Sequence, residues 1–542
     1  MLFRHPFQNL FFLLICIVVV VAAYLRVEQI SQIYDEYDDV GVIALQKAPL
    51  QELELDLDLG PIKRIRFDVT YLQNIETSIW YGAFIGHVWT YAPGQYILAS
   101  LLLSDDLTAR QRHIAVRAIS AAISIATILL LFIFMTRMSS SENGQNWIAL
   151  PITALLAFST NTILYAMHSS PYSFYGFALL VALIVGDRAL KRNGSFGNAC
   201  VGLAVLCLFN YLVLLVLVPL LVFKLVEILV SRRMSAIAII KNVSGWNVIQ
   251  MLVMAISLMA VAVFLKISSG TRGVSLPPVD NWADLIEALR VFSTQFGKVA
   301  HNILFGAVPA RWMTILLGLF VLLSSLFLVR SWIRAKNYSA LLSAVLLGGW
   351  VFLFIANKLP FDQSRHTLML LPPFCLLLFW SVHPLVLRVA APVIMKGSIL
   401  ITLVMGVVGF SNAQEAFGPR KAMLNKQTLA MHDPDFVLTY GFTLGPMVDF
   451  HEDDVQVINL DLKSAVEFDW STIEQGSRIL LVSQTEPLDE VRLADFKKRF
   501  AEVFEKRKVS KHLEASTGIF FPFHSYPLSS NQNGAYIYQL AD

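Results

Sequence analysis

The chain has 542 residues, of which 56% are hydrophobic and 15% are charged, and its mean hydropathy is +0.61. Soluble domains seldom keep such an apolar excess in long unbroken blocks, so the composition predicts an α-helical polytopic membrane protein. The formal net charge of +3 is small for this length and gives no reason to expect a nucleic-acid partner.

The first apolar run covers 7–25 and is long enough to cross a bilayer, which takes about 20 residues. It ends at Arg26 without a small-residue cleavage pattern, so we expect a retained signal-anchor helix. The same window finds about ten further spans. They cover residues 114–135, 148–166, 171–186, 198–209, 211–230, 247–266, 313–329, 339–356, 366–382 and 386–410. Asn210-Tyr211 is the expected hairpin between the fifth and sixth spans.

The distribution of basic residues predicts the orientation of the chain. Lys and Arg lie in the loops after the second, fourth, sixth, eighth and tenth spans, whereas the short loops at 167–170 and near 210 have neither. The positive-inside rule therefore places the N-terminus in the cytoplasm and the C-terminus on the outer face. The four cysteines, Cys16, Cys200, Cys207 and Cys375, lie in apolar runs, which argues against a disulfide framework or a zinc site. Low cysteine use and compact spans favour a bacterial inner membrane.

Two domains are expected. Residues 1–411 would form the transmembrane domain, with a large first outer loop over 26–112, and residues 412–542 would form a small extracytoplasmic α/β domain. Alternating apolar and polar residues predict strands in this second domain, and 488–506 reads as a charged amphipathic helix. The predicted strands are 436–440, 455–460, 478–482 and 534–540.

An acidic segment follows the first span and is the sharpest candidate for chemistry. Four carboxylates in five positions lie beside Tyr34 and Tyr37: Asp35, Glu36, Asp38 and Asp39. Close carboxylates repel, which raises the pKa of at least one of them and suits a general base, or they share a divalent cation. A solvated acidic loop is the alternative.

Two further outer loops carry polar candidates. The short loop after the third span has His168 and Tyr172, which would line a cavity or simply form a helix-to-helix turn. The loop before the tenth span has Lys358, Arg365 and His366. Arg suits bidentate phosphate recognition and Lys acts as a point charge, although both could instead reach the membrane interface as anchors.

The order of several motifs resembles a known family. These are Asp35-Glu36 after the first span, the run Tyr91-Ala-Pro93-Gly-Gln-Tyr96, the paired helices of 203–229, and Arg365-His366 followed by Pro372-Pro373. This arrangement is similar to the C-type superfamily of membrane glycosyltransferases, and most similar to the family 39-like group of protein O-mannosyltransferases and lipid A aminoarabinose transferase. The chain departs from the family in lacking an acidic residue and an arginine in the loop between the third and fourth spans.

The resemblance implies an inverting transfer of a hexosyl or pentosyl group from a polyprenyl-phosphate carrier to a glycan, lipid or protein acceptor on the outer face. Asp35 would act as the base with Glu36 assisting, while Lys358, Arg365 and His366 would hold the donor phosphate. The expected substrate pocket contains Tyr34, Asp38, Asp39, Tyr91, His168 and Tyr172. Two other readings are a noncatalytic subunit or scaffold of an envelope polysaccharide system and a membrane transporter.

Overall fold

The fold is known from a computed structural model. It describes residues 6–28, 30, 54–57, 65–68, 94, 98, 102, 109–138, 145–168, 172–191, 196–232, 276–277, 280–308, 310–355, 365–417, 435–440, 456–459, 479–483, 508–510 and 536–541. The predicted site residues at 34–39, 91 and 358 lie outside these ranges.

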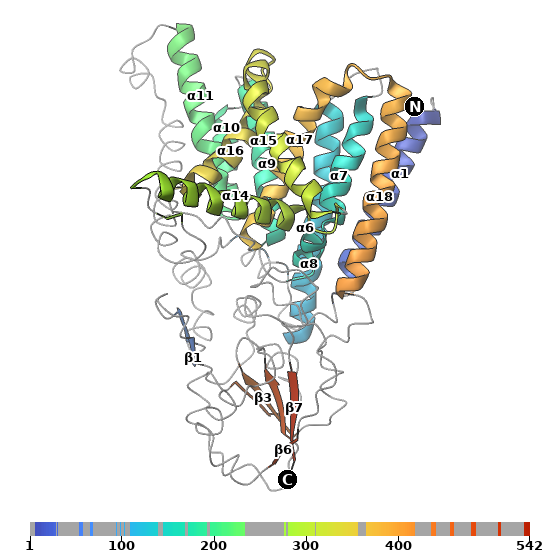
Figure 1. The fold of residues 1–542 in the computed structure, drawn as a ribbon, viewed down its shortest axis with the longest axis vertical. Helices are drawn as coiled ribbons and strands as arrows, with labels where there is room; N and C mark the ends of the chain where they lie inside the picture. Colours follow the sequence, from blue (N-terminus) through green and yellow to red (C-terminus); the bar gives the residue numbers. More distant parts are fainter. Residues whose placement is uncertain are drawn as a thin grey trace.

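Twelve α-helices occur in the described residues: α1 (Pro6–Val27), α6 (Ala109–Met138), α7 (Ala149–Phe158), α8 (Thr160–Ala166), α9 (Tyr172–Lys191), α10 (Phe196–Cys207), α11 (Leu214–Arg232), α14 (Trp282–Leu304), α15 (Arg311–Arg334), α16 (Tyr338–Ile355), α17 (Leu371–Val386) and α18 (Ala391–Phe417). Three 3-10 helices join them: η4 (Gln145–Ile148), η6 (Tyr211–Val213) and η7 (Arg365–Leu370). Most of the helices run along one direction and form a bundle (Figure 1).

Seven of the described helices are long and apolar enough to cross a bilayer: α1, α6, α9, α15, α16, η7 with α17, and α18. This fits the expected integral membrane protein. The bent pair α7 and α8 makes an eighth span if it is one unit, and α10 and α11 contribute shorter apolar helices. The predicted span at 247–266 lies outside the described residues, so the total of about eleven spans stays a prediction.

The span expected over 148–166 is not one straight helix. The helix breaks at Ser159, whose backbone is extended, and α7 and α8 meet at an angle of 58°. A break frees carbonyl groups at the end of α7 and N–H groups at the start of α8, which need partners inside the protein. Other parts of the chain supply these partners, as the site described below shows.

Helix α14 is a second feature that the sequence reading missed. It runs across the bundle, near the end at which α15 begins (Figure 1). Its C-terminal half packs on α15, where the Phe296 ring lies 3.1 Å from the position that a Cβ on Gly318 would occupy. The absence of a side chain at Gly318 allows this close approach.

Helix α9 is the buried centre of the bundle. In its apolar window 72% of the residues are buried, compared with 22% in α15 and in α18. Helices α15 and α18 therefore lie at the periphery, where large apolar side chains such as Phe327 and Val407 are exposed. In a membrane protein these exposed apolar faces contact lipid.

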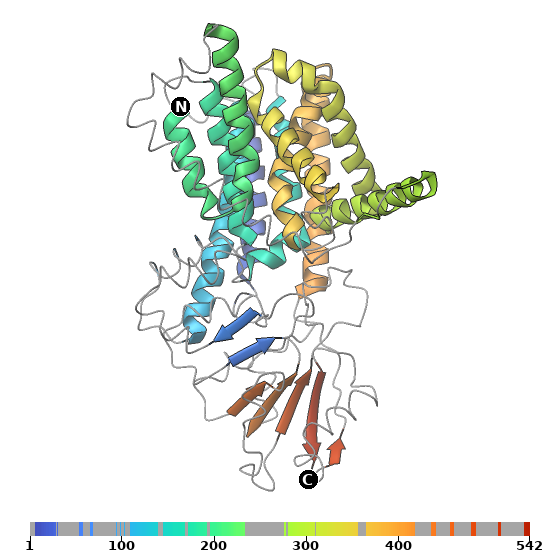
Figure 2. The ribbon, with the colours of Figure 1, turned by 90° about the vertical axis from the view of Figure 1, so that its left-hand side faces the viewer.

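In the described residues, seven short strands form two sheets at the end of the molecule opposite to the N-terminus (Figures 1 and 2). The antiparallel pair is β1 (Glu54–Leu57) with β2 (Ile65–Asp68), inside the expected first outer loop. The larger sheet has the order β4-β3-β5-β7-β6 and contains β3 (Phe436–Tyr440), β4 (Gln456–Asn459), β5 (Ile479–Ser483), β6 (Lys508–Ser510) and β7 (Tyr536–Ala541).

In the larger sheet β3 pairs in parallel with β4 and β5, and β7 is antiparallel to β5 and β6. Four of the strands lie where the alternating pattern predicts them, and β6 was not predicted. The expected helix at 488–506 lies outside the described residues, so a complete α/β domain stays a prediction.

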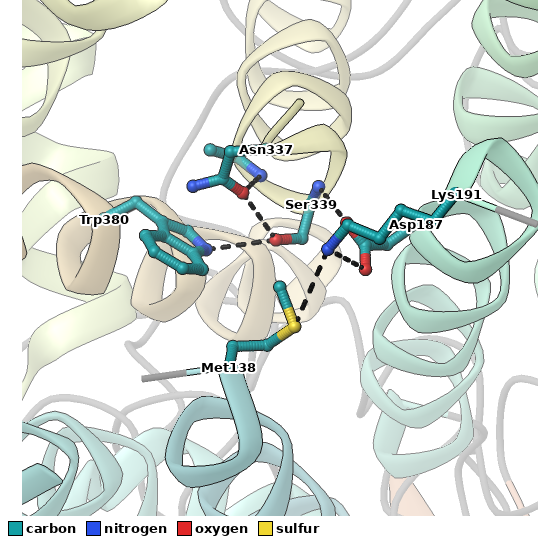
Figure 3. A network of polar contacts seen from close by, with 7 residues as sticks. Met138, Asp187, Lys191, Asn337, Ser339 and Trp380 are labelled. Atoms are coloured by element: carbon teal, nitrogen blue, oxygen red, sulfur yellow. Dashed lines mark hydrogen bonds and ion pairs between the residues drawn. The ribbon is translucent and has the colours of Figure 1, made fainter. Parts of the chain in front are cut away.

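At the N-terminal end of the bundle a polar network ties four helices together (Figure 3). The Asp187 carboxylate of α9 accepts a bond from the Ser339 backbone N–H of α16 at 3.0 Å and pairs with Lys191 at 2.9 Å. Ser339 Oγ accepts the Trp380 indole N–H of α17 at 3.0 Å. Lys191 Nζ also lies 3.8 Å from Met138 Sδ at the end of α6. A carboxylate at the N-terminus of α16 also complements the helix dipole.

Candidate functional site

The predicted site residues divide into two groups. Asp35, Glu36, Tyr34, Asp38, Asp39, Tyr91 and Lys358 lie outside the described residues. Arg365 and His366 form the first turn of η7, and His168 and Tyr172 lie at the turn between α8 and α9. Both of these turns are at the end of the bundle that faces the sheets (Figure 1).

The turn between α8 and α9 is lined by aromatic rings. The Tyr165 ring centroid lies 5.2 Å from that of Tyr172 and 5.7 Å from that of His168. Tyr172 in turn meets Tyr175 edge-on at 5.7 Å. His168 and Tyr172 are only 2% and 4% exposed. The two residues predicted to line a pocket are thus part of a packed aromatic row in this structure.

Asn210 connects this row to η7. Its side-chain N–H group donates to the Tyr175 carbonyl at 3.2 Å and lies 3.5 Å from Met369 Sδ, while its oxygen accepts from the Leu212 N–H and caps η6. The helix is interrupted between Cys207 and Tyr211, at the place where the hairpin was expected, and the two separate spans stay a prediction. Gly94 also reaches this place, because its N–H donates to the Leu208 carbonyl at 2.7 Å.

A second polar group, here called the asparagine node, consists of Asn161, Asn302 and Thr367. The Asn161 side-chain N–H group donates to the Asn302 side-chain oxygen at 2.8 Å and to the Asn302 carbonyl at 3.0 Å. Asn302 then donates to Thr367 Oγ1 at 3.0 Å. All three residues are at most 9% exposed. The node joins α8, α14 and η7, and Thr367 is two residues from Arg365 in η7.

Carbonyl groups at the end of α14 accept hydrogen bonds from the break between α7 and α8. Ser159 Oγ donates to the Ile303 carbonyl at 2.9 Å, and the Thr160 N–H donates to the Phe305 carbonyl at 2.8 Å. Gly306 follows with a φ of +77°, and a Cβ there would lie 1.8 Å from Thr160 Oγ1. The chain can therefore turn against α8 at this point only with glycine.

Arg26 binds the other side of the break. Its guanidinium donates to the Ala157 carbonyl at 2.9 Å and to the Leu156 carbonyl at 3.3 Å, at the end of α7. It also donates to Ser124 Oγ at 2.9 Å and is fully buried. No carboxylate pairs with it in the described part of the chain. A buried cation bound only by neutral oxygens keeps its positive charge near this end of the bundle.

His301 lies beside the asparagine node at the end of α14. Burial lowers the pKa of its imidazole from the ordinary value of 6.5, and the positive charge of Arg311 lowers it further. The ring packs edge-on against Phe305 at 5.3 Å. Burial and the nearby positive charge both favour the neutral form of the imidazole.

The sequence reading did not single out Arg26, Asn161, Asn302 or Thr367. Arg26 was read as the flank of the first span, and Asn161 lies inside an apolar run. A polar residue within an expected span was the available signal, since such residues usually need a partner there.

A metal site is not visible in the described residues, where no three His, Cys, Asp or Glu side chains gather. The acidic segment at 35–39 lies outside that part of the chain. A comparison with protein-family models, curated proteins and solved structures found no match to this chain. The functional argument therefore rests on its own residues.

Proposed function

We propose that this protein is a membrane glycosyltransferase that transfers a sugar from a polyprenyl-phosphate carrier to a glycan, lipid or protein acceptor. The observation that carries the proposal is the convergence of the η7 start, the α8–α9 turn and η6 at one end of an apolar bundle. A lipid-linked phosphate would meet such a site at the membrane surface, with its chain along the apolar helices.

The chemistry requires a base for the acceptor hydroxyl and cations for the departing lipid phosphate. Asp35 is the proposed base, with Glu36 assisting. Arg365 and Lys358, with His366 nearby, are the proposed phosphate-binding residues. The asparagine node supports this assignment because it fixes Thr367 and hence the helical turn that begins at Arg365. The N-terminus of that turn also favours an anion.

The proposal also covers the number of spans, their orientation and the C-terminal domain. About eleven spans would place the N-terminus in the cytoplasm of a bacterium and a C-terminal α/β domain outside the inner membrane. A divalent cation at the 35–39 carboxylates is compatible with this chemistry and would be detected as loss of activity with a chelator.

The direct test uses the full-length protein in nanodiscs with a panel of radiolabelled polyprenyl-phosphate sugars and membrane extract. We expect release of sugar from one donor, and a loss of about 100-fold or more in Asp35→Asn. Arg365→Ala should raise the KM for the donor by about tenfold or more, because a charge-assisted hydrogen bond is lost. Arg330→Ala, an exposed arginine at the opposite end of α15, is the matched control.

Three results separate the parts of the proposal. If the wild-type protein neither binds nor cleaves any donor, the glycosyltransferase assignment is wrong. Near-normal transfer by folded Asp35→Asn protein would refute the base alone. An unchanged KM in Arg365→Ala would refute the phosphate contact alone.

One observation favours a second candidate, a transporter, because discontinuous helices are common at transporter binding sites. The bent pair α7 and α8 is such a helix. Three of its freed backbone groups are, however, already bonded: the Leu156 and Ala157 carbonyls to Arg26 and the Thr160 N–H to the Phe305 carbonyl after α14. Uptake of a labelled lipid-linked sugar by proteoliposomes, without cleavage, would favour the transporter.

A further inference from the structure

The apolar side of α14 is buried along one half of the helix and exposed along the other. In the C-terminal half, Ala300 and Leu304 are 9% and 1% exposed. In the N-terminal half, Trp282, Ile286 and Leu289 are 80%, 65% and 58% exposed. These three residues are four and three positions apart, so they share one side of the helix.

The side of the same half that faces away from these three residues is charged, and Arg290 borders the apolar side, one turn after Ile286. Glu287 and Arg290 form an ion pair at 2.6 Å, and their side chains are 47% and 71% exposed. Asp284 lies one turn before Glu287 on this polar side. The first half of α14 therefore has one apolar face and one water-compatible face, which is the pattern of a helix that lies in a membrane interface.

The position of α14 in the fold agrees with this pattern. The helix crosses the bundle near the end at which α15 begins, and its N-terminal part extends beyond the other helices (Figures 1 and 2). The first turns of α15 expose Trp312 by 63% and Leu316 by 55%. Exposed tryptophans at the end of a span are typical of the membrane–water boundary. The exposed face of α14 is thus adjacent to a surface that contacts lipid.

We propose that the first half of α14 inserts its Trp282, Ile286 and Leu289 side into the bilayer on the side of the sheets, with Asp284 and Glu287 facing water. The lipid bilayer is the occupant because the exposed face continues the lipid-facing surface of α15. The other end of the same helix carries Asn302, so the helix links the membrane surface to the asparagine node. The insertion does not depend on the proposed enzymatic activity.

The test measures the accessibility of spin labels in nanodiscs. The four native cysteines are replaced by alanine in the full-length chain, and a single label is attached at Ile286→Cys or, on the polar side, at Asp284→Cys. Leu316→Cys supplies a lipid-facing reference on α15. We expect the label at 286 to be relaxed mainly by oxygen, like the label at 316, and the label at 284 to be relaxed mainly by a water-soluble nickel complex.

Equal access of the nickel complex to labels 286 and 284 would overturn the proposal. A measurable dipolar coupling between labels at position 286 of two protein copies would also overturn it, because a second copy of the chain would then cover this face. Labelled proteins must keep the thermal unfolding midpoint of the unlabelled chain. If Ile286→Cys fails that criterion, Leu289→Cys tests the same face with the same expected result.

Discussion

At the scale of single residues, Arg26 has the most demanding environment in the described chain. Removing a guanidinium from water costs several kcal/mol unless its donors are bound. Four hydrogen bonds meet that requirement, two of them with the carbonyl groups that the break after α7 leaves free. Arg26 and the break at Ser159 therefore stabilise each other, and neither is favourable without the other.

Replacing Arg26 tests this dependence. We expect Arg26→Leu to lower the free energy of unfolding by about 3 kcal/mol, since each buried acceptor left without a donor costs about 1–3 kcal/mol. Chemical or thermal unfolding in detergent micelles measures the change. Arg137→Leu at the exposed end of α6 is the matched control and should change stability by less than about 0.5 kcal/mol. Equal effects of the two substitutions would contradict the role given to Arg26.

Gly306 offers a second single-residue test. Gly306→Ala places a Cβ 1.8 Å from Thr160 Oγ1 and strains a backbone with a φ of +77°, so we expect destabilisation of about 2 kcal/mol or more. Gly397→Ala is the control, because nothing lies within 4 Å of its added Cβ in α18. The control substitution should leave the free energy of unfolding unchanged or raise it, because alanine favours the helical conformation. A lower unfolding midpoint in Gly397→Ala than in Gly306→Ala would contradict the tight contact at Gly306.

The lowered pKa of His301 predicts that the stability of the folded protein depends on pH. Its pKa in the folded protein lies below 6.5, so the unfolded chain binds the proton first as the pH falls. The stabilising contribution is complete above about pH 6.5 and decreases as the pH drops through the folded-state pKa. The unfolding midpoint of the wild-type protein should therefore fall on acidification, and His301→Gln should lose part of that fall. A His301→Gln profile parallel to the wild type would show that other groups cause the dependence.

At the scale of elements, the apolar runs were predictable and their irregularities were not. A window of about 20 residues finds spans because length and hydropathy set them locally. The break at Ser159 depends on Ile303 and on Arg26, which are far away in the sequence, so no local pattern specifies it. Helix α14 was missed because only one face is apolar, which lowers its average hydropathy over the window.

The contact between Asn161 and Asn302 is an element-scale prediction, since it joins α8 to α14. A double-mutant cycle with Asn161→Leu, Asn302→Leu and the double variant should give a coupling free energy of about 1–2 kcal/mol. Each single variant leaves buried polar atoms without their partner, whereas the double variant removes both. Unfolding free energies of the four proteins measure the coupling. Additive effects within about 0.3 kcal/mol would mean that the two side chains do not interact in solution.

At the scale of the whole molecule, the bundle has a different polar group at each end. The asparagine node and the α8–α9 turn lie toward the sheets, and the network around Asp187 lies toward the N-terminus (Figures 1 and 3). Sequence order placed His168, Tyr172 and Arg365 at the same end because alternating spans return to the same side. Their burial and contacts depend on packing, which the sequence pattern does not specify. The roles of Asp35, Glu36 and Lys358 stay predictions.

The separation of the two ends can be measured with one pair of variants. Asp187→Ala removes the acceptor of the Ser339 N–H and the partner of Lys191, so it should lower the free energy of unfolding by about 1–3 kcal/mol. If the proposed activity is correct, the rate of sugar release per folded molecule and the KM for the donor should not change. Arg365→Ala should show the reverse pattern, with little loss of stability and a raised KM. A raised KM in Asp187→Ala would instead mean that the two ends are coupled through α9 and α16, and the site would then extend through the whole bundle.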